Sequence, residues 1–317
     1  MDTGKGTKIR DYQCGLSLVR SRRGMDVVNI LNSLKRKPVL LGTIVALLVL
    51  FGANLLSSSS RSIFALVPVN TLIANSYFWN LVTCSFFETN VFKLLIDLVG
   101  VCHLAVDLEY DSLESFGLYL GVCILACSTC TSFFCFVRFF MTSDDLMLVS
   151  PVYGFGGVYF SLLSYIRKAK SHTPVNVAYP AVTYQNLAFW VYLTQLMLRL
   201  VGLDMLSKDF YLSTVAILFS WTYLSFVYKD SEGNVGTKSD DFKFVNMFPV
   251  VLHPIAVPLS TAFYNIFVIV GLFPALEVEK KSSQHHLRYH TILRSIQLQL
   301  QYLFHKRFDS QQLNIIT

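Results

Sequence analysis

Two sets of residues have types and spacings that could support chemistry. Cys123, Cys127 and Cys130 recur at i, i+4 and i+7, which places three thiols on one helical face. Soft thiolates bind metals, but no histidine stands in register as a fourth ligand, so neutral thiols packing against a neighbouring helix are favoured. Asp97 and His103 are six residues apart, a turn of about 240° on a helix, so they do not share a face. The sequence predicts no metal site and no cofactor.

A glycine-rich motif, Gly154-Phe155-Gly156-Gly157, lies in an apolar stretch. Glycines in a membrane helix let a neighbouring backbone approach closely, so helix packing is the favoured interpretation. We group Trp221 with these glycines as a packing residue. The alternative interpretation is a degenerate nucleophile motif, but Gly156 has no side chain oxygen or sulfur with which to attack a substrate.

The composition indicates which elements must carry these residues. The chain has 317 residues, of which 53% are hydrophobic and only 15% charged, and its mean hydropathy is +0.50. A soluble domain carries about a quarter charged residues, so a soluble enzyme is excluded first. Residues 1–38 hold nine Lys/Arg against three Asp, which equals the whole net charge of +6. A basic head before an apolar run indicates a segment retained in the cytosol, and we expect no nucleic-acid partner.

The apolar runs predict an all-α polytopic membrane protein with six spanning helices. The expected spans are 39–56, 91–106, 115–137, 146–166, 173–198 and 210–228, the second being the weakest because it carries Lys93, Asp97 and His103. Residues 57–90 are rich in aromatics and too interrupted to span, which is typical of an interfacial loop. Lys and Arg concentrate in the loops on the side of the head, so both termini are expected to be cytosolic.

The segment 244–273 is apolar but contains Pro249, Pro254 and Pro258. Because each proline removes a backbone donor, we expect a re-entrant or interfacial hairpin on the cytosolic face. The expected organisation is a basic segment 1–38, a transmembrane domain 39–228, a loop with the proline-broken segment 229–274, and a cytosolic tail 275–317. The tail is expected to form one short helix near 291–304.

Four stretches, read in order, resemble a known group of membrane proteins. They are 78–88, with Trp79, Thr83 and Glu88; the motif 154–157; the sequence Ser-Trp-Thr-Tyr-Leu at 220–224; and 241–254, with Phe244, Phe248, Pro249 and Pro254. Together they resemble the rhomboid superfamily, and more narrowly the transmembrane protein 115 family of non-catalytic Golgi proteins. These seven named residues are expected to form a partner or interface surface. The resemblance covers about residues 40–272. Two departures are that 104–110 lacks the family's Arg and Pro, and that Val250 replaces its acidic residue.

The resemblance implies a six-helix rhomboid-like bundle in which Gly156 and Ser213 stand at the serine and histidine positions of the proteases. It therefore implies no catalytic activity. It also implies a multi-pass Golgi protein that assists retrograde transport to the endoplasmic reticulum, with the bilayer and vesicle-tethering or coat-associated proteins as partners. Homo-oligomerisation is compatible with this function. The alternatives are a Derlin-like pseudoprotease of the endoplasmic reticulum membrane and, less favoured, a transporter that uses Asp97 and His103.

Overall fold

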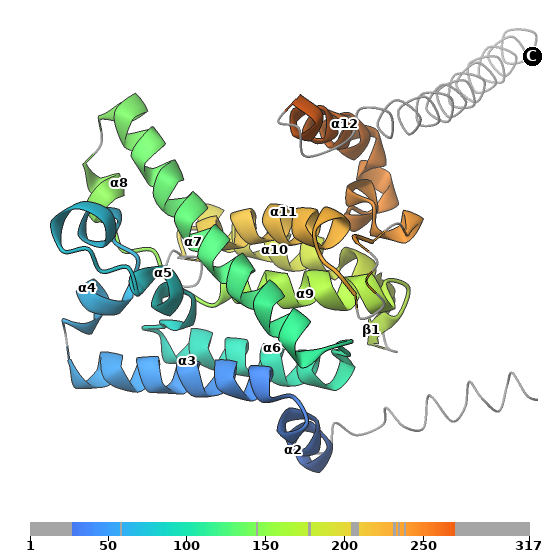
Figure 1. The fold of residues 1–317 in the computed structure, drawn as a ribbon, viewed down its shortest axis with the longest axis horizontal. Helices are drawn as coiled ribbons and strands as arrows, with labels where there is room; N and C mark the ends of the chain where they lie inside the picture. The colour runs from blue at the N-terminus through green and yellow to red at the C-terminus, as the bar shows by residue number, and fades with distance from the viewer. Residues whose placement is uncertain are drawn as a thin grey trace, which may run out of the picture. The chain divides into compact units, whose positions relative to one another are not determined.

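The computed structural model describes residues 27–269 apart from 58, 144, 177–178, 204–208, 231–232, 234 and 238. The predicted helix near 291–304 and most of the basic head lie outside the described residues. The chain divides into two units, one ending at Pro249 and one beginning at Val250. Helices form most of the first unit, as the composition predicts (Figure 1).

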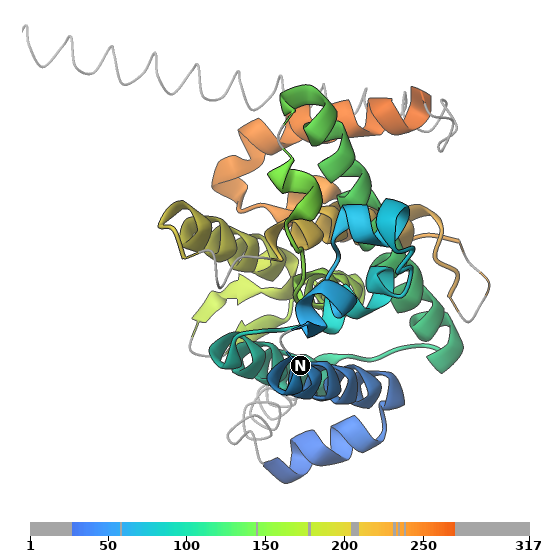
Figure 2. The same ribbon diagram turned by 90° about the vertical axis from the view of Figure 1, so that its left-hand side faces the viewer.

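The N-terminal part of the first unit pairs three helices. They are α2 (Val27–Lys35), α3 (Pro38–Leu56) and α6 (Val91–Asp107), and α6 packs against both of the others (Figure 2). Pro38 occupies the first turn of α3, where a missing amide costs nothing. The Lys37 ammonium donates to the carbonyls of Ala105, at 2.5 Å, and of Leu108, and so satisfies orphan acceptors at the end of α6. Burial, together with the charge of Lys170, lowers the pKa of Lys37.

The loop between α3 and α6 contains only short helical turns. They are α4 (Ser60–Phe64), the π-helical turn η1 (Asn70–Ala74), α5 (Asn80–Thr83) and η2 (Cys84–Phe86). Two side chains hold α5 to α4: Trp79 Nε1 donates to Ile63 O at 3.0 Å, and Thr83 Oγ1 donates to Phe64 O at 2.9 Å. No spanning element forms between 59 and 90, as expected, while the interfacial position of this loop stays a prediction.

The centre of the first unit is a short helix enclosed by longer ones. This helix, α9 (Gly156–Lys170), packs against α6, α7 (Leu113–Thr142), α10 (Tyr184–Leu200) and α11 (Phe210–Phe226), and it lies between them in Figure 1. Eleven of its 15 residues are buried. A helix that is buried on nearly all sides needs small or apolar residues all round, and 156–166 supplies them.

Two expected spans begin later than the sequence analysis predicts. In place of one helix over 146–166, the chain forms a single turn, α8 (Leu146–Val149), and then a stretch without helix to Phe155. Val152 pairs with Leu66 as an isolated antiparallel bridge, and Gly154 has a φ of +130°, a conformation that side chains disfavour. Apolar composition alone could not reveal that the helix starts at Gly156.

The expected span 173–198 is also wrong in its first half. Residues there form an antiparallel hairpin of β1 (Pro174–Asn176) and β2 (Tyr179–Thr183), in which Pro174 pairs with Thr183 and Asn176 with Tyr179. Two prolines and several β-branched residues in 173–183 disfavour helix. The helix α10 begins only after Thr183, whose side chain forms a capping box with Asn186.

Length alone does not establish the number of spans. Among the described residues, α3 and α7 are long and apolar enough to cross a bilayer, while α6, α10 and α11 each have 17 residues. The six-span arrangement and its orientation therefore stay predictions.

After α11 the chain folds back in two 3₁₀ turns, η4 (Asp240–Phe242) and η5 (Phe244–Met247). Trp221 Nε1 donates to Phe242 O at 2.9 Å, and the ring of Phe244 lies 5.2 Å from that of Trp221. Arg167 Nη2, at the end of α9, donates to Lys243 O at 2.7 Å. The block 240–248 therefore packs on the helices of the first unit.

The second unit has described residues in η6 (Val250–Leu252) and α12 (His253–Ile269). In the described part of this unit one helix of 17 residues runs through Pro258, while the hairpin expected over 244–273 as a whole stays a prediction. Pro254 lies in the first turn, where its missing amide is harmless, so only Pro258 interrupts the hydrogen-bond ladder. Whether α12 lies on the bilayer or enters it stays a prediction.

Candidate functional site

The first turn of α9 places Gly156 directly against Ser213 on α11. A side-chain carbon added at Gly156 would clash with Ser213 Oγ and with the carboxylate of Asp209. Gly156 and Ser213, the two positions for which the sequence resemblance implies the serine and histidine of the proteases, are thus adjacent in this fold. Neither residue pairs with the other, since Gly156 has no side chain and Ser213 Oγ is buried without a hydrogen-bond partner among the described residues.

The neighbouring glycines show why α9 and α11 approach so closely. A carbon added at Gly154 would lie 2.7 Å from Asp209 Cβ and 2.9 Å from Glu88 Oε1, which is closer than side chains tolerate. One added at Gly157 would meet Leu212 Cβ at 3.5 Å, an ordinary contact. Gly154 and Gly156 therefore have little space for a side chain, whereas Gly157 lies at normal packing distance.

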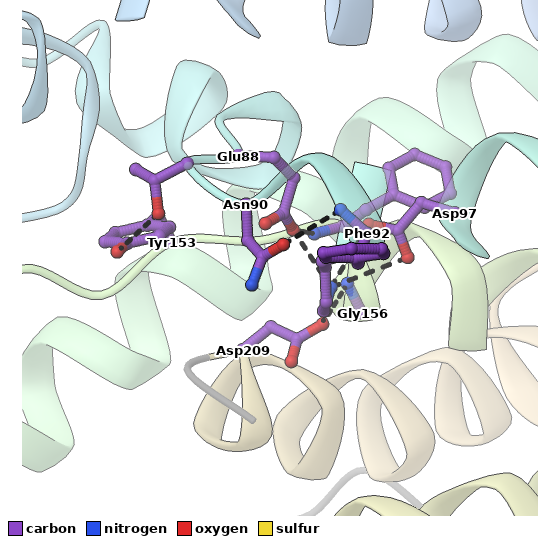
Figure 3. A network of polar contacts seen from close by, with 10 residues as sticks. Glu88, Asn90, Phe92, Asp97, Tyr153, Gly156 and Asp209 are labelled. Atoms are coloured by element: carbon purple, nitrogen blue, oxygen red, sulfur yellow. Dashed lines mark hydrogen bonds and ion pairs between the residues drawn. The ribbon is translucent and has the colours of Figure 1, made fainter. Parts of the chain in front are cut away.

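A buried ammonium joins three carboxylates beside this glycine turn. Lys93 Nζ lies 2.9 Å from Glu88 Oε1, 3.1 Å from Asp97 Oδ2 and 2.9 Å from Asp209 Oδ2. Figure 3 shows Glu88, Asp97 and Asp209 converging from the loop before α6, from α6 itself and from the start of α11. We call these four residues the ion cluster. All four are buried, and Asp209 is completely inaccessible to solvent.

Two carboxylates of the ion cluster also cap α9. Glu88 Oε1 accepts a hydrogen bond from the Phe155 amide at 3.1 Å, and Asp209 Oδ2 accepts one from the Gly156 amide at 2.8 Å. The first amides of a helix have no partner within the helix, and its N-terminal dipole favours negative charge. A helix that begins inside the protein must find such acceptors there. The ion cluster thus fixes the position at which α9 starts.

The charges of the ion cluster do not balance. Three carboxylates face one ammonium, and Asp209 Oδ1 has no partner among the described residues. Burial raises the pKa of the Glu88 carboxyl, and the Lys93 charge opposes that rise. Removing one partner from such a buried network costs more than the pair itself contributes, because an unpaired charge remains.

The residues whose types suggested chemistry, namely Asp97, His103 and the three cysteines, do not form one site. Asp97 belongs to the ion cluster, but His103 is not among the residues that contact Lys93. Cys123 and Cys127 are buried, whereas Cys130 is exposed, so the three thiols do not share one buried environment. Within the described part of the chain, no group of three or more His, Cys, Asp or Glu side chains has an arrangement that could hold a metal ion.

Lys93 and Asp209 are members of the site that the sequence does not single out. Lys93 stands four residues before Asp97 on α6, a spacing that brings two side chains to one helix face, and this signal was available. Asp209 offered no comparable signal, because it lies 116 residues from Lys93 along the chain and only the packing of α11 on α9 brings them together.

The other residues that carry the resemblance have different environments. Trp79 is 48% exposed and stacks on Tyr77, with ring centroids 4.7 Å apart. Phe244 is buried, with 4% of its surface exposed, and Phe248 lies 5.6 Å from the ring of Phe189 on α10. Phe244 and Phe248 are thus parts of the packing on α10 and α11, and Pro249 ends the first unit.

The first unit thus has a buried central helix that begins at a glycine turn and is enclosed by other helices, and two helices among the described residues are long and apolar enough to cross a membrane. Residues 38–301 match the family described as Eukaryotic integral membrane protein (DUF1751), and the chain belongs to this family. It is also 26% identical over 208 residues to Rhomboid-like protein 19 of Arabidopsis thaliana, a match that covers 64% of this chain and 65% of that protein. These matches confirm the prediction of an integral, rhomboid-like membrane protein.

Proposed function

We propose that the protein is a non-catalytic rhomboid-like scaffold of the Golgi membrane, of the transmembrane protein 115 kind, that supports retrograde transport to the endoplasmic reticulum. Six spans, cytosolic termini and vesicle-tethering or coat-associated partners belong to the same proposal. The family match and the rhomboid-like relative support the class of protein. The Golgi location and the transport role rest on the sequence resemblance of 78–88, 154–157, 220–224 and 241–254.

The observation that carries the non-catalytic part is the packing of Gly156 against Ser213. Acyl transfer by a serine enzyme needs a nucleophilic hydroxyl and a base within hydrogen-bond reach. Here the position on α9 has no side chain, and any side chain added there would overlap Ser213 Oγ and Asp209. The position on α11 carries a hydroxyl rather than a base.

The ion cluster also supports a non-catalytic protein, because its carboxylates occupy backbone amides that a serine hydrolase would need. Free backbone amides at a buried helix start can stabilise the oxyanion of a reacting substrate. In this protein, Glu88 and Asp209 already accept hydrogen bonds from the amides of Phe155 and Gly156. Negative charge at this place would repel a developing oxyanion. We infer that these contacts serve the fold rather than hydrolysis.

The buried position of Phe244 changes where we expect partners to bind. A side chain that is 96% covered by its own chain cannot be a contact for another protein unless the fold opens. We therefore assign Phe244 to the fold. The exposed Val250, Val251 and Ile255 of the second unit form the apolar surface that we propose lies on the cytosolic leaflet.

The experiment is to express the tagged full-length protein and to measure its overlap with Golgi and endoplasmic-reticulum markers, together with proximity labelling from the cytosolic tail. Golgi overlap and labelling of tethering or coat proteins would support the proposal. Location in the endoplasmic reticulum with labelling of dislocation factors would instead support the Derlin-like alternative. The Gly156→Ala variant should be less stable than the wild type, and serine-hydrolase probes should label neither protein.

A further inference from the structure

Two arginines meet on one tyrosine at the end of the bundle where α7 and α10 finish and α11 begins. Arg138 Nη1 donates to Tyr211 Oη at 3.2 Å, and Arg199 Nη2 donates to the same oxygen at 3.3 Å. The Arg199 guanidinium also lies 4.9 Å from the ring centroid of Tyr211 and 5.3 Å from that of Phe210. Three helices therefore bring two cations to a single neutral acceptor.

This pair of cations lacks a balancing charge within the described residues. None of the carboxylates there lies within ion-pairing distance of Arg138 or Arg199. Each guanidinium has five N–H donors, of which one is used on Tyr211. The two like charges repel each other at one oxygen. The donors that Tyr211 does not use therefore favour an anion with several acceptor oxygens. Arginine forks match phosphate geometry particularly well.

The surroundings of the pair are apolar and exposed. On α7, Phe134, one turn before Arg138, is 47% exposed with its ring 5.7 Å from that of Tyr211, and on α10 Leu200, directly after Arg199, is 72% exposed. Exposed aromatic and aliphatic side chains on an integral membrane protein face lipid chains. Arg138 lies one turn before the end of α7, and Arg199 lies one residue before the end of α10. In the predicted six-span arrangement, the pair thus lies where two spanning helices end, which is the depth of the headgroups.

The predicted topology makes this position unusual. With the basic head in the cytosol, these helix ends lie on the opposite face, where loops hold few Lys or Arg. The preference of Lys and Arg for cytosolic loops therefore does not explain two arginines at this position, whereas the binding of an anion would explain them.

We propose that Arg138 and Arg199 form a binding site for the phosphate of an anionic phospholipid, with Tyr211 holding the two guanidinium groups together. The lipid chains lie along the exposed apolar surface of α7 and α10, while the phosphate accepts hydrogen bonds from both forks. The site is independent of the scaffold function and of the ion cluster.

The test is native mass spectrometry of the purified full-length protein titrated with phosphatidic acid, with phosphatidylcholine of equal chain length, and with inorganic phosphate. The wild type should prefer phosphatidic acid over phosphatidylcholine. Loss of charge-assisted hydrogen bonds predicts that Arg138→Gln/Arg199→Gln weakens phosphatidic acid binding by about tenfold or more. The matched control Arg36→Gln/Arg61→Gln removes the same charge at exposed positions and should keep the preference.

Two outcomes would overturn the proposal. One is an unchanged preference for phosphatidic acid in the double glutamine variant. The other is inorganic phosphate binding as tightly as the lipid, which would make the site a free-phosphate site. If the glutamine variant does not fold, Arg138→Lys/Arg199→Lys carries the test. It keeps both charges but loses the planar forks, so affinity should fall, and wild-type affinity would contradict the proposal.

Discussion

Replacement of Lys93 by Met is the perturbation that most directly probes the ion cluster. Methionine has a similar length and fits an apolar interior, so the change removes the charge with little change in volume. It leaves Glu88, Asp97 and Asp209 facing one another without a cation. Two of these carboxylates also cap α9, so their repulsion should loosen the first turn of the central helix.

The size of the effect follows from the geometry. Lys93 makes three ionic contacts at 2.9–3.1 Å, and all its partners are buried. Removing one partner of a buried ionic network costs about 3–5 kcal/mol, because the other charges stay buried and unpaired. For a domain of this size, about 1 kcal/mol shifts the melting temperature by about 2–4 °C, so the variant should melt about 6–20 °C lower.

The assay is the thermal unfolding of the full-length protein in nanodiscs, with Lys35→Met as the matched control at an exposed position of α2. The double variant Lys93→Met/Asp209→Asn should recover part of the loss, since neutralising a carboxylate relieves the repulsion. The deficit of Lys93→Met should also shrink as the pH falls, because burial raises the pKa of the Glu88 carboxyl and protonation relieves the repulsion. A Lys93→Met melting temperature equal to that of the Lys35→Met control would refute the reasoning.

Four further predictions concern other parts of the chain. Gly156→Ser should lower the melting temperature because the new side chain overlaps Ser213, and it should not be labelled by serine-hydrolase probes; specific labelling would contradict a non-catalytic site. Phe244→Asp should cost about 3 kcal/mol or more and reduce folded yield, whereas Val251→Asp, at an exposed position, should fold normally; equal yields would argue against packing of the block 240–248. Lys37→Met should cost about 1–3 kcal/mol, because two carbonyls at the end of α6 lose their donor; an unchanged melt would make this contact dispensable. Glycosylation acceptors inserted in 57–90 and 203–208 should be modified and those in the tail should stay bare; a glycosylated tail would place it across the membrane.

The sequence predicted the helices whose ends coincide with a change in polarity. The boundaries of α3, α6 and α11 fall within two residues of the expected spans, because charges or polar loops flank each apolar run. The starts of α9 and α10 could not be predicted in this way. There the chain stays apolar through an extended stretch and through a hairpin, so hydropathy does not change where the backbone does.

The candidate site was predictable only in part. The glycines of 154–157 indicated a close approach, and the structure shows which contacts require it at Gly154 and Gly156. The ion cluster depends on Asp209, which only tertiary packing brings to Lys93. One sequence carries no direct signal for a pair of charges so far apart along the chain.

A measurement in cells lacking the protein tests the proposed function most directly. The rate at which a cargo with an endoplasmic-reticulum retrieval signal returns from the Golgi should fall in these cells. It should recover on re-expression of the wild type, which has no nucleophile at Gly156. A normal return rate without the protein, or recovery that depends on a hydrolase activity of the re-expressed chain, would contradict a non-catalytic scaffold of retrograde transport.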